Sequence, residues 1–210
     1  MSFSFDARFG PSSKALEVII AHTADILLAQ GMMFMESVWE LHPSGEGSPS
    51  VSTLAAIPAS EIDEVAALTA NWWGRSLEWH SPEFGDVYLQ IFAALAAEKQ
   101  SYYVVYNEGR GAVHMRVKNS DAKESLLGML TEFMDALEIP ICTYGDKSGA
   151  FFLPPSLKDI EDMLDDSVKW PKAIAIADTS LLPPTLLDAL RKKEELVRWT
   201  VDGRVIVSKI

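Results

Sequence analysis

The spacing of apolar residues along the chain predicts a series of short strands. Near the N-terminus, Phe3, Phe5 and Ala7 alternate with polar residues over 2–9, the period-two pattern of a half-buried strand. Similar runs predict strands over 32–41, 102–106, 112–117, 141–144, 150–153, 173–177, 197–201 and 204–210. The last strand pair flanks Asp202-Gly203, which predicts a type I′ hairpin, and glycine-containing segments at 107–111 and 145–149 favour two more hairpins. The Gly, Ser and Pro cluster at 43–52 predicts a loop.

Apolar residues that recur three and four positions apart predict helices between these strands. The predicted helices cover 12–30, 60–74, 120–139, 156–165 and 184–190. Ser12 or Ser13 is the expected N-cap of the first helix, Ser120 or Asp121 that of the third, and Ser156 with Asp159 suggests a capping box. The two clearest apolar faces consist of Leu16, Ile19, Ile20, Thr23 and Leu27, and of Leu126, Leu127, Leu130, Phe133, Met134 and Leu137. The segment 87–97 fits a strand or a helix, and its alanine content favours a helix.

This order of elements, with hairpins between helices, predicts an α+β fold with a mixed, mostly antiparallel sheet and four to six helices. The chain has 210 residues, of which 48% are hydrophobic, enough to bury a sizeable core. The sequence shows neither an interdomain linker nor an internal repeat. We therefore expect one α+β domain over 1–210.

The net charge of −12 is concentrated in one part of the chain. Residues 36–86 carry nine acidic side chains and only one basic side chain, Arg75. An excess of acid is unfavourable for binding a phosphate backbone, so no direct nucleic-acid ligand is expected. The acidic region is either a solvated surface that maintains solubility or a face presented to a basic partner.

No residue pattern for catalysis, metal binding or a cofactor is found. The four histidines and one cysteine are far apart: His22, His42, His80, His114 and Cys142. The segment 145–149 lacks the first glycine of a phosphate-binding loop, and Cys142 is expected to be a small core residue rather than a nucleophile. The acidic run 159–166 is interpreted as a solvated helix face or a second patch for a partner. We assign no catalytic residue, metal site or cofactor.

The segment 71–80 contains three of the six tryptophans. Trp72 and Trp73 continue the apolar face of the predicted helix 60–74, so they are expected in the core. The residues after Gly74 are expected on the surface, where tryptophan and arginine often dominate binding. The candidate partner-binding residues are Glu61, Asp63, Glu64, Arg75, Glu78, Trp79 and His80.

The segment FSFDARFGPSSKALEVIIAHTADILL at 3–28, in a small acidic chain without a catalytic motif, resembles immunity proteins of bacterial polymorphic-toxin and type VI secretion (T6SS) systems. Among these it is most similar to the class paired with restriction-endonuclease-fold nuclease toxins. The resemblance implies a protein that binds a cognate toxin with a basic surface and neutralises it by stoichiometric occlusion. Alternatives are a small hydrolase that reverses a toxin modification and an adaptor or assembly chaperone.

Two further features bear on localisation. The N-terminus has no signal-peptide pattern, and a single cysteine fits a reducing compartment, so a cytoplasmic location is expected. The longest apolar run, 91–97, is too short to span a membrane, and no membrane partner is expected. The sequence does not predict the oligomeric state.

Overall fold

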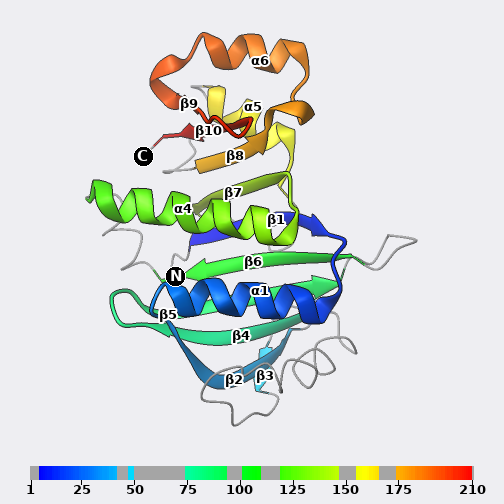
Figure 1. Ribbon diagram of the computed structural model, residues 1–210, viewed down its shortest axis with the longest axis vertical. Helices are drawn as coiled ribbons and strands as arrows, with labels where there is room; N and C mark the ends of the chain where they lie inside the picture. Colours follow the sequence, from blue (N-terminus) through cyan, green and yellow to red (C-terminus); the bar gives the residue numbers. More distant parts are fainter. Residues whose placement is uncertain are drawn as a thin grey trace.

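A single antiparallel sheet organises the chain (Figure 1). The structure, a computed structural model, describes residues 5–41, 47–49, 74–93, 101–109, 119–146, 155–165 and 174–209. In these residues ten strands lie in the order β3-β2-β4-β5-β6-β1-β7-β8-β10-β9. Their bounds are β1 (Phe5–Ser12), β2 (Met33–Leu41), β3 (Gly47–Pro49), β4 (Gly74–Ser81), β5 (Gly85–Ala93), β6 (Tyr102–Glu108), β7 (Ile141–Asp146), β8 (Ile174–Asp178), β9 (Val197–Trp199) and β10 (Arg204–Ser208).

Helices cover both faces of this sheet. Helices α1 (Leu16–Ala29) and α4 (Ser120–Leu137) lie side by side on one face (Figure 1). Helices α5 (Leu157–Leu164) and α6 (Pro184–Arg191) contribute to a second core on the other face. Neighbouring residues of β7 show this division, because Cys142 belongs to the first core and Ile141 to the second. Two short 3-10 helices, η2 (Thr179–Leu181) and η3 (Glu194–Leu196), complete the described elements. The predicted α+β class is confirmed, while the extent of the domain over 1–210 stays a prediction.

The apolar faces predicted for the first and third helices are confirmed. Every residue assigned to them is buried in α1 or α4.

The predicted caps of these two helices differ from the observed ones. Ser12 belongs to β1 and its hydroxyl donates to the carbonyl of Leu137 at 2.8 Å, so α1 begins after Ala15 with no side-chain cap. Asn119 caps α4, because its side-chain oxygen accepts hydrogen bonds from two backbone N–H groups of the first turn. The capping box of α5, by contrast, is confirmed.

The helix predicted over 87–97 is wrong, because Gly85–Ala93 forms strand β5. Val87, Leu89 and Ile91 are buried on the side of the sheet that carries α1 and α4. β5 pairs with β4 on one side and with β6 on the other, and these two ladders favour the extended conformation. The residues from 94 to 97 lie outside the described part of the chain.

The predicted hairpins are confirmed only at the C-terminal end. β9 and β10 are antiparallel neighbours, but their connection is longer than a type I′ turn, and among the residues of that connection only Gly203 has a positive φ, of 84°. In the predicted loop 43–52, Gly47–Pro49 forms β3 against β2. The partner strands predicted at 112–117 and 150–153 lie outside the described residues. β6 pairs with β5 and β1, and β7 with β1 and β8, so both strands have neighbours on each side.

One carboxylate is fully buried in the first core. Glu108 at the end of β6 has no exposed surface. The hydroxyl of Tyr106 donates to it at 3.0 Å, and the hydroxyl of Tyr144 donates to its other oxygen. This arrangement satisfies the carboxylate and joins β6 to β7 across β1.

No helix in the described residues is long and apolar enough to cross a membrane.

The only cysteine, Cys142, provides a test of the core. Its side chain has no exposed surface, and burial raises the pKa of the thiol well above its usual range although the charge of Arg8 lowers it slightly. We expect the native protein to react with Ellman's reagent only as fast as it unfolds. In concentrated guanidinium chloride one thiol per chain should react at once. Rapid reaction of the native protein would show that this part of the core is open.

Candidate partner-binding surface

The segment predicted to carry the partner-binding residues is a strand rather than a surface loop. β4 begins at Gly74, where a helix was expected to end. Trp79 has no exposed surface, and its ring centroid lies 5.3 Å from that of Phe34. The prediction that Trp79 is an exposed anchor is therefore wrong. Leu77 is buried in the same core, so β4 has the ordinary alternation of a strand.

Glu78 and His80 alternate with Trp79 and therefore point to the opposite face of β4. The Nδ1 atom of His80 lies 3.3 Å from a carboxylate oxygen of Asp86. Burial raises the pKa of Tyr88, and the nearby carboxylates of Glu78 and Asp86 raise it further. These are partly exposed polar groups, and whether they bind a partner stays a prediction.

The remaining predicted site residues cannot be placed at this surface. Glu61, Asp63 and Glu64 lie outside the described residues, as do Trp72 and Trp73, which were predicted to be in the core. Arg75 is described only through its backbone in β4.

The structure brings other acidic side chains together on α1 and α4. The two helices run antiparallel. The ring of His22 in α1 contacts the carbonyl of Ala136 near the end of α4 at 2.9 Å. Gln30, just after α1, lines the same hollow as Met129, which is earlier in α4. They contain six carboxylates and one lysine, a net charge of −5. We call these two helices, with their exposed carboxylates, the acidic helical pair, and the carboxylates are its members. They are Glu17, Asp25, Asp121, Glu124, Glu132 and Asp135.

Two members of the acidic helical pair are neutralised within the molecule. Glu124 pairs with Arg198 at 3.0 Å, and Asp135 pairs with Arg204 at 2.5 Å. Asp25 and Glu132 make no ion pair with any other residue that the structure describes. Both side chains are exposed, so their charges are available to a molecule that approaches the helices.

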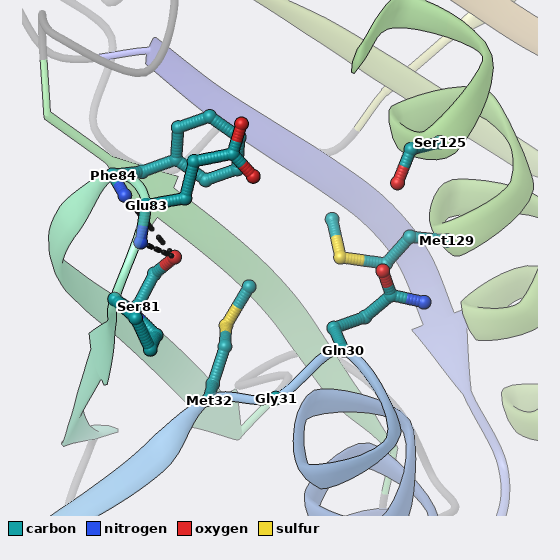
Figure 2. A pocket seen from close by; sticks show the side chains of 9 residues that line it. Gln30, Gly31, Met32, Ser81, Glu83, Phe84, Ser125 and Met129 are labelled. Atoms are coloured by element: carbon teal, nitrogen blue, oxygen red, sulfur yellow. Dashed lines mark hydrogen bonds between the residues drawn. The ribbon is translucent and has the colours of Figure 1, made fainter. Parts of the chain in front are cut away.

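A hollow of about 250 Å³ lies where α1 ends, between α4 and the turn joining β4 to β5 (Figure 2). Its lining residues are Gln30, Gly31, Met32, Ser81, Pro82, Glu83, Phe84, Ser125 and Met129. Met32 and Met129 are buried, whereas the carboxylate of Glu83 and the amide of Gln30 are exposed. The hollow therefore combines an apolar base with a polar rim.

Local hydrogen bonds fix the turn that forms one side of this hollow. The hydroxyl oxygen of Ser81 accepts from the backbone N–H groups of Glu83 at 3.3 Å and Phe84 at 3.2 Å. Gly85 then adopts a φ of 81°, which a side chain would disfavour. These contacts hold Glu83 and Phe84 in place at the hollow.

Comparisons with known proteins give one distant similarity. No protein-family model matches the sequence, and no curated protein matches it. Among solved structures, the chain is similar to the Pseudomonas aeruginosa T6SS protein PA0821, with 11% sequence identity and a TM-score of 0.47. The match covers 99% of this chain, which spans only 64% of that protein. It is a distant likeness to a T6SS protein, and neither the fold nor the site rests on it.

The acidic helical pair could have been found from the sequence. Its carboxylates occupy the polar positions opposite the two clearest apolar faces. A count of charges by region conceals them, because residues 87–210 carry eighteen acidic and fifteen basic side chains, so the acids of α4 do not stand out. The hollow had no such signal, because it combines three segments that are distant in sequence. No group of His, Cys, Asp and Glu suited to hold a metal ion occurs within the described ranges.

Proposed function

We propose that this chain is an immunity protein that binds a cognate secreted toxin with a basic surface, such as a nuclease, and neutralises it by stoichiometric occlusion in the cytoplasm. The acidic helical pair is the observation that supports the proposal. The two adjacent helices account for −5 of the overall charge of −12. Among the described residues Asp25 and Glu132 make no ion pair, so their carboxylates provide a negative surface. Such a surface accelerates encounter with a basic protein and disfavours approach to other acidic surfaces.

The deciding experiment is a titration of toxin activity. The first step is to identify the adjacent gene. A secreted protein encoded there is the candidate toxin, and its activity is measured while the purified chain is added. Neutralisation that is complete at one equivalent supports the proposal. Complete neutralisation far below one equivalent would instead indicate a hydrolase that acts on the toxin, and a bound partner without toxicity would indicate an adaptor.

The electrostatic part of the proposal predicts the behaviour of a charge-reversal variant. Asp25→Lys combined with Glu132→Lys should reduce the association rate with the toxin by about tenfold at low salt, because it inverts two charges that face a basic partner. The measurement is stopped-flow association at several salt concentrations. For the wild-type chain the rate should fall as salt increases, since salt screens the attraction.

The matched control is Glu161→Lys combined with Glu194→Lys. These side chains are also exposed, and the substitutions change the net charge by the same amount, but they lie on α5 and η3 rather than on the acidic helical pair. We expect a much smaller effect on the association rate. Equal effects of the two double variants would contradict a binding role that is specific to these two helices.

A further inference from the structure

The hollow between α1, α4 and the β4–β5 turn has a more specific chemistry than the acidic helical pair. In Figure 2 the side chains of Glu83, Phe84 and Met32 lie on one side, and those of Gln30, Met129 and Ser125 lie on the other. Two thioethers form its buried part, and a carboxylate, an amide and a hydroxyl surround it. A ligand with an apolar stem and a cationic polar head would complement both parts.

The size of the hollow favours a side chain over a free small molecule. Its volume of about 250 Å³ is below the range of about 300–1,000 Å³ that is usual for pockets that enclose small ligands. One long side chain of a docked protein could enter it while the surrounding surfaces meet. Charge complementarity indicates that this side chain is basic, because the hollow presents the exposed carboxylate of Glu83 and lies between two helices on which Asp25 and Glu132 make no ion pair with described residues.

Arginine fits the polar groups better than lysine does. Its planar guanidinium has five N–H donors, and the hollow offers acceptor oxygens on Glu83, Gln30 and Ser125. Phe84 lines the hollow together with Glu83, so the lining also offers an aromatic ring to a guanidinium. Met32 and Met129 would contact the three methylenes of the arginine stem.

We propose that this hollow receives one arginine side chain from the surface of the protein partner. The proposal rests on the proposed function in taking that partner to be the basic toxin. The Ser81 hydrogen bonds contribute by holding Glu83 and Phe84 in the turn before the partner arrives, which reduces the loss of conformational freedom on binding.

The first test uses the isolated chain and a small probe, N-acetyl-arginine-N-methylamide. In a two-dimensional NMR titration of the labelled protein, shifts should be confined to Gly31 and its neighbours, to 81–85 and to 125–129. Glu83→Gln should weaken this binding about fivefold, because it removes the paired charge. Glu132→Gln is the matched control, since it removes an exposed carboxylate of α4 that does not line the hollow, and it should leave binding unchanged.

Three outcomes would overturn the proposal. They are equal binding of the uncharged citrulline analogue, shifts spread over the acidic helical pair that persist in Glu83→Gln, and tighter binding of the lysine analogue.

A second measurement separates this proposal from the proposed function. If Glu83→Gln binds the toxin as tightly as the wild-type chain while Asp25→Lys/Glu132→Lys is impaired, the arginine site is wrong and the proposed function stands. Failure of the wild-type chain to neutralise the toxin at one equivalent would reject the proposed function, while the NMR result would still decide the arginine site.

Discussion

Replacement of Trp79 by alanine is expected to lower the free energy of unfolding by about 3–5 kcal/mol. The indole has no exposed surface and packs against Phe34 within the core beneath α1. Alanine would leave a large cavity between the sheet and the helices, which the surrounding side chains fill only in part. Equilibrium unfolding in urea, followed by circular dichroism, measures the change.

Two variants serve as controls for this prediction. Trp79→Phe should lose much less stability than Trp79→Ala, since it keeps most of the packed volume and the buried indole nitrogen makes no hydrogen bond in the described structure. Trp199 is 43% exposed on β9, so Trp199→Ala should cost less than about 1 kcal/mol. Similar losses for Trp79→Ala and Trp199→Ala would contradict the burial of Trp79.

Replacement of Glu108 by leucine is expected to destabilise the protein by about 2–6 kcal/mol. The substitution removes the acceptor of two tyrosine hydroxyls, those of Tyr106 and Tyr144, in a part of the core without access to water. Each buried donor that loses its partner costs about 1–3 kcal/mol. Thermal and urea unfolding of the variant would give the value.

A compensated variant distinguishes lost hydrogen bonds from a simple change of shape. When Tyr106→Phe and Tyr144→Phe are added to Glu108→Leu, the two tyrosine donors are removed together with their acceptor. The triple variant should therefore be more stable than Glu108→Leu alone, although it has two more substitutions. If the additional changes lower stability further, the two hydroxyls do not depend on Glu108.

The elements predicted correctly are those that local sequence determines. The apolar face of α4 repeats over five turns and ends before Pro140, and the start of α6 at Pro184 follows from the fixed φ of proline. The elements predicted wrongly depend on neighbours in the sheet. β5 has an ambiguous period, and only its pairing with β4 and β6 selects the strand.

The site residues show the same limit. Trp79 was placed on the surface because Gly74 was interpreted as the end of a helix, whereas the glycine begins a strand whose odd positions face the core. The sequence predicts Glu108 in a hairpin turn, because the segment that contains Asn107, Glu108 and Gly109 has the composition of a loop. Its burial depends on the tyrosine of β7, which lies 36 residues away in sequence.

The position of β1 in the middle of the sheet has a consequence for synthesis of the chain. Phe5 pairs with Glu108 on one side and with Asp146 on the other, so β1, which precedes the other described strands, has both of its neighbours far downstream. Such long sequence separations slow folding, because the intervening loops must close before the pairing is gained. During translation β1 therefore stays an unpaired strand until β6 is available, and the two parts of the sheet are joined only after β7 has emerged.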